Sequence, residues 1–139
     1  MTHHVKLIST ATVISGDEVL LVRYANMPDH QRGWFMPHDL LEDLEHPQDA
    51  AARALREQLA IVAPALVLKH IESFRGRDGT WHLSFHFLAE ITEIAQPQAN
   101  AAISEATWFK RDQLPPRDQV SHHGWALDVL ETVTATASR

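Results

Sequence analysis

The first part of the chain alternates apolar and β-branched residues with short polar breaks. Residues 5–14 and 18–24 are rich in Val, Leu and other β-forming residues, and the small polar residues 15–17 separate them. This spacing is typical of two paired strands joined by a tight turn, so we predict a β-hairpin. After a polar loop, the apolar residues 34–36 are followed by a proline and predict a brief further strand.

The next segment has the periodicity of a helix that packs on one side. Pro47 suits the first turn of a helix, because its missing N–H group would be unpaired there in any case, and the residues that follow are strong helix formers. Ala51, Leu55 and Leu59 recur every four residues, which places them on one face. We predict a helix over residues 47–59 that packs this face against a sheet.

Residues 65–74 and 80–91 predict a second hairpin, because both segments are β-like and a turn separates them. Successive side chains of a strand point to opposite faces. The second strand has one apolar face and one polar face. We expect the apolar face to be core and the polar face to look into a cavity or solvent. The apolar residues are Trp81, Leu83, Phe85 and Phe87, and the polar residues are His82, Ser84 and His86.

The last part of the chain predicts a loop, a strand and a helix. Residues 93–104 are rich in Ala, Gln and Asn and favour a loop, after which Trp108 and Phe109 indicate a short buried strand. Residues 124–134 carry apolar side chains at helical spacing. We expect an amphipathic helix there.

Composition and charge narrow the class of protein. The 139 residues are 45% hydrophobic and 22% charged, as is typical of a globular domain, and the formal net charge is −6. The basic residues are scattered, so there is no basic stripe for polymeric DNA or RNA. The lack of cysteine favours a reducing, cytoplasmic location. No apolar run approaches the roughly 20 residues that a membrane span needs, so we expect no membrane partner.

Residues 39–61 resemble the Nudix box. The family pattern is Gly-x5-Glu-x7-Arg-Glu-U-x-Glu-Glu-x-Gly-U, where U is a bulky aliphatic residue. The spacing survives better than the residue identities. Asp39 and Ala60 replace the two glycines, and Ala54 and Gln58 replace two of the glutamates. The positions that match the pattern are Glu45, Arg53, Leu55, Glu57 and Ile61.

Two further segments agree with this family. Trp34-Phe35-Met36-Pro37 resembles the lead-in before the box, and Glu105-Ala106-Thr107-Trp108-Phe109 resembles its late Glu-x-x-Trp-Phe segment. The resemblance therefore covers nearly the whole chain and implies one Nudix-like domain over residues 1–139. It implies an α/β/α sandwich with a mixed β-sheet between helices. A homodimer is possible on the same basis, because dimers are common among relatives.

The resemblance also implies a reaction and a cofactor. In the family, water attacks a phosphorus atom of a nucleoside diphosphate derivative, while Mg²⁺ or Mn²⁺ holds the pyrophosphate and screens its charge. Positions 54, 57 and 58 share one helix face, from which three carboxylates would converge on the metal. Glu57 alone is charged here, so we expect weakened metal binding and weakened hydrolysis. The loop supports this expectation, since side chains restrict positive φ where the family has glycines, at His38, Asp39 and Leu44.

The candidate catalytic residues are Glu57, Arg53 and Glu105, and the candidate metal ligands are Glu57, Gln58 and Glu45. Each has a second interpretation. Glu57 is either a metal ligand or a helix-surface partner of Arg53. A structural bridge to Glu45 or Glu42 suits Arg53 better than direct catalysis, and acidic residues beside a helix N-terminus are ordinary dipole partners. Glu105 is either a base that reaches in from its loop or an ordinary surface residue.

The candidate substrate-binding residues are Arg23, His82 and His86. Arginine matches the geometry of phosphate, although isolated surface charges are common. On a strand, His82 and His86 would lie about 13 Å apart at roughly 3.3 Å per residue, which is too far to share one metal ion. They suit the wall of a pocket or a position that faces solvent.

Two classes of function fit these features. One is a Nudix-like hydrolase of a nucleoside diphosphate derivative that holds fewer metal ions than usual. The other is a binding module that keeps the pocket and senses or sequesters a nucleotide-like small molecule without cleaving it.

Overall fold

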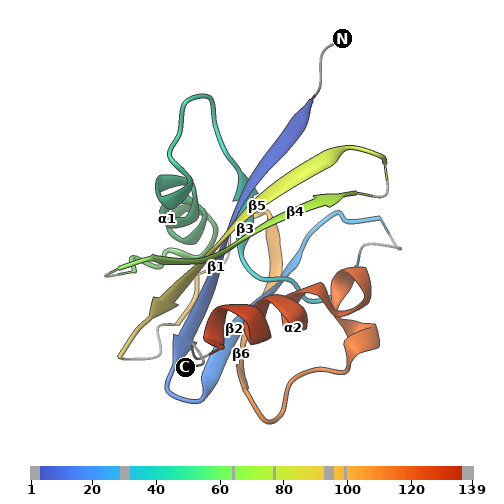
Figure 1. The fold of residues 1–139 in the computed structure, drawn as a ribbon. Helices are drawn as coiled ribbons and strands as arrows, with labels where there is room; N and C mark the ends of the chain where they lie inside the picture. The colour runs from blue at the N-terminus through green and yellow to red at the C-terminus, as the bar shows by residue number, and fades with distance from the viewer. Residues whose placement is uncertain are drawn as a thin grey trace.

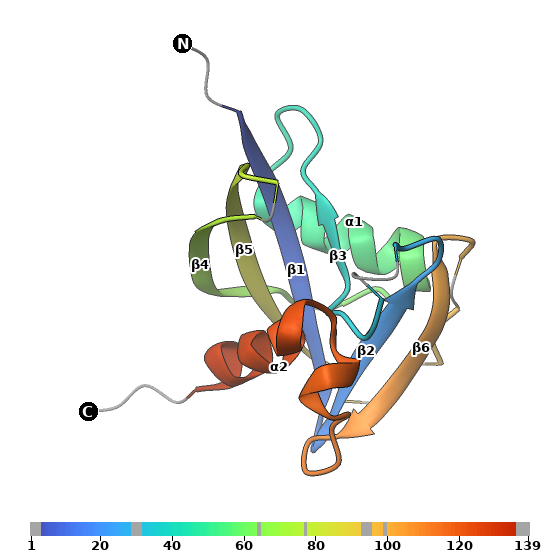
Figure 2. The same ribbon diagram turned by 90° about the vertical axis from the view of Figure 1, so that its right-hand side faces the viewer.

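The computed structural model describes residues 4–28, 32–63, 65–76, 78–92, 96–98 and 100–135. Within them a mixed β-sheet lies between two helices, as Figures 1 and 2 show from perpendicular directions. This arrangement confirms the α/β/α sandwich. The elements in chain order are β1 (Val5–Ser15), β2 (Glu18–Tyr24), β3 (His38–Leu40), α1 (Pro47–Leu59), β4 (Val67–Arg75), β5 (Trp81–Glu90), β6 (Ile103–Lys110), a 3-10 turn (Arg117–Gln119) and α2 (Ser121–Thr134).

The long strand β1 organises the sheet, whose strand order is β4-β5-β1-β2-β6 with β3 paired to β1. β1 runs parallel to β5, from Val5 opposite Trp81 to Ile14 opposite Glu90. On its other side, the first half of β1 pairs with β3 and only its end pairs with β2. β2 therefore diverges from β1 (Figure 2), and side chains from several elements meet where the sheet opens.

Each face of the sheet packs against one helix. The predicted apolar face of α1 is confirmed, since Ala51, Leu55 and Leu59 are all 0% exposed and lie in one core cluster. Burial of each leucine contributes about 2 kcal/mol, so this face fixes α1 on the sheet. On the opposite face, α2 shares a second cluster with Leu21 and Met36. In the part of the chain that the structure describes, no helix is long and apolar enough to cross a membrane.

Both predicted hairpins are present. β1 and β2 are antiparallel with Ser15 opposite Glu18, and Gly16 in the turn has a φ of 59°, which glycine adopts without strain. β4 and β5 are also antiparallel, with Glu72 opposite Ser84. This second register decides which side chains of the two strands meet on each face.

The prediction of a strand at residues 34–36 is wrong, because neighbouring residues there form hydrogen bonds with different segments. The N–H group of Trp34 donates to the carbonyl of Gln119 at 3.1 Å, whereas Phe35 exchanges hydrogen bonds of 2.7 and 2.9 Å with Val22. The result is two isolated bridges rather than a ladder. The regular strand β3 lies further along the chain.

The expectation for the two faces of β5 is confirmed for the polar face, whose His82 and Ser84 line a cavity, and is wrong for Trp81 of the apolar face. Ser84 and His86 on the polar face are 0% and 1% exposed, whereas Trp81 on the apolar face is 43% exposed. The reason is that α2 covers the polar face, and the ring of Trp125 lies 6.1 Å from that of His86. Polar side chains are therefore enclosed between the sheet and α2.

The end of the chain differs in detail from the prediction. The strand around Trp108 has 8 residues, and most of its side chains are half-buried or exposed rather than buried. The predicted C-terminal helix is present within Ser121–Thr134. Gly124 has a φ of 94° and both residues before it also have positive φ, so regular helical turns begin only after Gly124.

Candidate functional site

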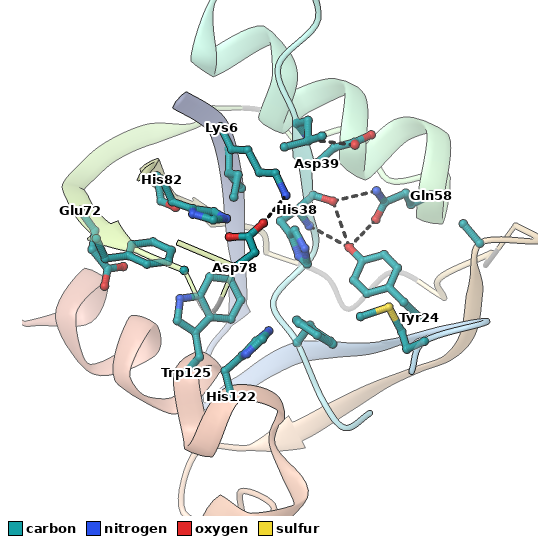
Figure 3. A pocket seen from close by; sticks show the side chains of 18 of the residues that line it. Lys6, Tyr24, His38, Asp39, Gln58, Glu72, Asp78, His82, His122 and Trp125 are labelled. Carbon is teal, nitrogen blue, oxygen red and sulfur yellow. Dashed lines mark hydrogen bonds and ion pairs between the residues drawn. The ribbon is translucent and has the colours of Figure 1, made fainter. Parts of the chain in front are cut away.

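A cavity of about 1240 Å³ lies where the sheet opens. Side chains from strands β1 to β5 and from both helices line it. Figure 3 shows Gln58 and Tyr24 on one side of this cavity, Glu72 and His82 on the opposite side, and Trp125 at the α2 end. The cavity thus contacts both the helix of the box and the polar face of β5.

Arg53 is the centre of an ion-pair network that ties α1 to the segment before it. Its guanidinium donates to Glu45 at 2.9 and 3.0 Å, to Asp39 at 2.9 Å and to the carbonyl of Leu40 at 2.9 Å. The contact with Glu57 is longer, at 3.4 Å. The side chains of Arg53 and Glu45 are 11% and 13% exposed, so water screens this pair weakly, whereas Asp39 is 40% exposed. The predicted bridge from Arg53 to Glu45 is therefore present.

This network also favours the charged forms of Glu45 and Arg53. The hydrogen bond from Arg53 lowers the pKa of Glu45, and the same bond raises the pKa of Arg53 above its usual value. Glu45 accepts a further hydrogen bond of 2.9 Å from the backbone N–H of Glu42. As a candidate metal ligand, Glu45 is thus already occupied by groups of the protein.

Gln58 clamps β3 to α1 and β2. The backbone N–H of His38 donates to the hydroxyl of Tyr24 at 2.9 Å, and this hydroxyl donates to Oε1 of Gln58 at 2.8 Å. The Nε2 atom of Gln58 donates back to the carbonyl of His38 at 2.9 Å, which closes the ring of bonds drawn in Figure 3. Both ends of the amide are used. A glutamate at this position would have no proton to donate to that carbonyl.

The three helix positions at which the family carries carboxylates do not fit a Mg²⁺ or Mn²⁺ cluster. Ala54 is 1% exposed and offers no ligand atom, and the oxygen of Gln58 is held by Tyr24. Glu57 is the remaining carboxylate; it is 57% exposed and lies beside Arg53. Among the described residues, no group of three His, Asp or Glu side chains is placed to hold a metal ion. Mg²⁺ is usually held by one or more carboxylates together with phosphate oxygens and water, and one exposed carboxylate is a poor donor set.

The box keeps left-handed backbone at two positions where the family has glycine. Leu44 has a φ of 64°, and Ala60, which ends α1, has a φ of 57°. Side chains make this conformation less favourable by about 1 kcal/mol. His38 and Asp39, by contrast, are extended residues of β3 opposite β1. The fold thus enforces the turns despite the substitutions.

Aromatic rings form the inner wall of the cavity. The ring of His38 lies 5.0 Å from Tyr24, 5.3 Å from Phe35 and 5.7 Å from Trp125. Burial lowers the pKa of His38, and its Nδ1 atom lies 2.8 Å from the carbonyl of Met36. Burial also raises the pKa of the Tyr24 hydroxyl. This wall is therefore neutral and suited to stacking with a planar ring.

The two histidines of β5 lie in different surroundings. His82 lines the cavity, where it stacks on Phe74 at 4.9 Å and places Nδ1 at 2.8 Å from the carbonyl of Thr80. His86 does not face solvent but lies between the hydroxyl of Thr10 at 2.7 Å and the carboxylate of Glu72 at 3.0 Å. Burial lowers the pKa of His86. The substrate-binding role of both residues stays a prediction.

Arg23 and Glu105 lie on the neighbouring strands β2 and β6, directly opposite one another. Their charged groups are 3.7 Å apart, and the Arg23 guanidinium lies 4.4 Å above the ring of Trp34. Neither is among the described residues that line the cavity. The substrate-binding role of Arg23 and the catalytic role of Glu105 stay predictions.

Several cavity residues have no signal in the sequence pattern alone. Tyr24, His38 and Trp125 belong to segments that meet only because of the strand order. Glu72 and Ser84 share a face because of the hairpin register, which the sequence does not specify. The alternation of polar residues along β5 was the available signal.

Comparison with known proteins finds a matching domain family and similar folds. The NUDIX domain model matches residues 6–129. A MutT NUDIX hydrolase from Burkholderia pseudomallei has a similar structure, with a TM-score of 0.79 and 21% identity over 95% of this chain and 100% of that one. For a NUDIX hydrolase from Nitrosomonas europaea the TM-score is 0.77 and the identity 20%, over 93% and 88% of the two chains. A UDP-X diphosphatase has a TM-score of 0.74 and 18% identity, over 96% of this chain and 64% of that one.

The chain belongs to the NUDIX domain family, since the family model covers most of its length. At these identities the solved structures show a shared fold. No curated protein matches the chain.

Proposed function

We propose that this protein binds a nucleotide-like small molecule, a nucleoside diphosphate derivative or part of one, and that its Nudix box hydrolyses such a compound weakly or not at all. The arrangement of Gln58 carries this proposal. Its amide takes the place of a family carboxylate, and both of its ends are bonded within the protein. With Ala54 buried as well, the helix face has lost two of its three charged groups.

The cavity supports the binding half of the proposal. Its volume of about 1240 Å³ is ample for a nucleotide-sized compound. Its aromatic wall of Tyr24, Phe35 and Trp125 suits a heterocyclic ring. The structural likeness to a protein named UDP-X diphosphatase is in keeping with a ligand of this class.

The second candidate function is slow hydrolysis, and the position of Glu57 favours it. Glu57 is exposed and lines the cavity, so it is available to a ligand there. Bound Mg²⁺ or Mn²⁺ would supply charge screening for pyrophosphate in a family enzyme. In this chain such chemistry would rest on Glu57, with Arg53 as a positioning residue and Glu105 as a candidate base.

Calorimetry combined with a turnover assay tests the proposal. ADP-ribose and a UDP-sugar are titrated into the protein, first with EDTA and then with Mg²⁺ or Mn²⁺, and the released products are measured. We expect binding whose affinity changes by less than about threefold with metal, and turnover that Glu57→Gln leaves unchanged. Glu131→Gln, on the exposed side of α2, is the control for a lost surface charge.

Two results would contradict the proposal in different ways. Fast metal-dependent turnover that Glu57→Gln abolishes, and Glu131→Gln does not, would establish a working Nudix hydrolase. Absence of binding for every nucleotide and nucleoside at millimolar concentration would reject a nucleotide-like ligand altogether.

We further propose that residues 1–139 act as one domain in the cytoplasm, and that two copies form a homodimer. The lack of cysteine supports the location. Size-exclusion chromatography with light scattering tests the oligomeric state, and a monomer at micromolar concentration would reject the dimer.

A further inference from the structure

The polar side of β4, β5 and β1 forms a floor for the cavity. The strand registers place Glu72, Ser84 and Ile8 side by side in one row across these strands. All three line the cavity. The next row along the strands contains His86 and Thr10 on the same face. A carboxylate and a hydroxyl therefore lie next to one another on the floor, with further polar groups behind them.

His86 holds the carboxylate of Glu72 in place. A carboxylate only accepts hydrogen bonds, so the Nε2 atom of His86, 3.0 Å from Oε1 of Glu72, carries the proton of the neutral ring. The Nδ1 atom is then an acceptor, and the hydroxyl of Thr10 donates a hydrogen bond of 2.7 Å to it. Thr10 and His86 are 0% and 1% exposed. This series of hydrogen bonds fixes one oxygen of Glu72 and leaves the other oxygen without a protein partner among the described residues.

Ser84 adds an unsatisfied group beside Glu72. The residue is 0% exposed, and its hydroxyl has no hydrogen-bond partner among the described residues. An unpaired buried hydroxyl is unfavourable, and a ligand group that reaches it by displacing the side chains over it removes that cost. The floor thus contains a carboxylate that is 37% exposed and, beside it, a buried hydroxyl without a partner among the described residues.

The charge of the cavity selects the kind of partner. Among the described residues that line the cavity, Asp39, Glu57, Glu72 and Asp78 are acidic, whereas Lys6 and Arg75 are basic. Lys6 is already paired with Asp78 at 3.5 Å. Asp39 and Glu57 are paired with Arg53. Glu72 is therefore the acidic lining residue whose only partner among the described residues is the neutral ring of His86, and its carboxylate attracts a group that donates hydrogen bonds.

Aromatic side chains beside the floor favour a flat ligand. Phe74 and His82 are stacked within 18° of parallel on one side, and Trp125 lies on the α2 side. Figure 3 shows Glu72, His82 and Trp125 around the same opening. A planar ring placed there would stack on aromatic faces while its edge reaches the floor.

We propose that Glu72 and Ser84 bind the amino group of a planar heteroaromatic ring, the base of the nucleotide-like ligand, and that Glu72 determines specificity for this amino group. The amino group donates to the second oxygen of Glu72 and pairs with the hydroxyl of Ser84. His86 acts as a positioning residue for Glu72. The inference rests on the proposed function, because it assigns the base-bearing end of that ligand.

Calorimetry with uncharged nucleosides tests the inference without any contribution from phosphate or metal. Adenosine is compared with purine riboside, and guanosine with inosine, because each pair differs by one amino group. We expect the amino-bearing member of at least one pair to bind about tenfold more tightly to the wild-type protein, as a hydrogen bond to a charged group provides.

The Glu72→Gln variant gives a readout that a structural role would not produce. The oxygen of the new amide would keep the hydrogen bond from His86, and its NH₂ group would face the cavity in place of an acceptor. The preference for the amino group should then fall below about twofold or invert. Glu90→Gln, an exposed glutamate at the end of the same hairpin, should keep the full preference.

The outcomes separate this inference from the proposed function. If nucleosides bind without a preference in either pair, or if the preference survives Glu72→Gln unchanged, the role of Glu72 is rejected while a nucleotide-like ligand stands. If no nucleoside or nucleotide binds at all, both are rejected.

Discussion

At the scale of single residues, Gln58 stands where the family has a carboxylate, and its amide bonds to groups of the protein at both ends. An amide both donates and accepts, so Gln58 closes a ring of hydrogen bonds with Tyr24 and the backbone of His38. A carboxylate can accept from Tyr24 but cannot donate to the carbonyl of His38. The change that we propose weakens metal binding therefore also adds a hydrogen bond between α1 and β3.

Arg53 is expected to contribute to stability through its hydrogen bonds to Glu45 and Asp39. Arg53→Ala should lower the free energy of unfolding by about 2–3 kcal/mol, because it removes charged hydrogen bonds to Glu45, which is 13% exposed, and to Asp39, which is 40% exposed. Arg53→Lys should cost about half as much, since it keeps the charge but loses the forked geometry. Urea denaturation measures both.

The matched control for Arg53 is Arg56→Ala, three residues along the same helix and exposed. It should change the free energy of unfolding by less than about 0.5 kcal/mol. Equal losses in Arg53→Ala and Arg56→Ala would contradict a structural network centred on Arg53.

The sequence predicted part of this site. The solitary carboxylate at Glu57 and the bridge from Arg53 to Glu45 both follow from box spacing and helix geometry. The partners of Gln58 do not follow, because Tyr24 reaches it only after β2 diverges from β1. The position of Glu72 beside Ser84 also depends on long-range register.

At the scale of elements, Ala60 at the end of α1 and Leu44 in the preceding loop have left-handed backbone, which residues other than glycine disfavour. Ala60→Gly should raise the free energy of unfolding by about 0.5 kcal/mol, because the relief of left-handed strain exceeds the added entropy of the unfolded chain. Leu44→Gly, at a position 94% exposed, should have a similar effect.

Ala52→Gly, inside α1, provides the contrast. Glycine in a helix interior costs about 1 kcal/mol relative to alanine, so the sign should be opposite to that of Ala60→Gly. Thermal and urea denaturation measure each difference. Destabilisation by Ala60→Gly equal to that by Ala52→Gly would contradict the left-handed end of the helix.

Elements with a strong local period were predictable, whereas those fixed by distant partners were not. The spacing of Ala51, Leu55 and Leu59 identified α1 with its burial face. The apolar run at residues 34–36 resembled a strand, but Trp34 and Phe35 bond to segments that lie far apart in the sequence. Local pattern alone does not distinguish these cases.

At the scale of the whole molecule, buried histidines tie stability to pH. Burial holds the pKa of His38 and of His86 below the value near 6.5 of an unfolded histidine. The unfolded chain therefore binds more protons below about pH 6.5, so stability is fully present above that pH and falls as the pH falls through it. The slope approaches about 1.4 kcal/mol per pH unit for each such histidine.

Urea denaturation at pH 7.5, 6.5 and 5.5 measures this dependence. The carboxylates with lowered pKa values, such as Glu45, lose their contribution only at lower pH, outside this window. His86→Gln should reduce the slope, and His46→Gln, at an exposed position before α1, should leave it unchanged. Stability that rises as the pH falls from 7.5 to 5.5 would contradict the neutral state of both buried histidines.

The central claim is that the family fold is intact while its helix face no longer assembles a metal site. The most direct measurement is a Mn²⁺ titration, followed by calorimetry or electron paramagnetic resonance, of the wild type and of the double variant Ala54→Glu, Gln58→Glu. With both proteins shown to be folded, we predict at least about tenfold tighter Mn²⁺ binding to the variant, because two carboxylates rejoin Glu57 on one face. Equally tight binding to the wild type, lost in Glu57→Gln, would contradict the claim.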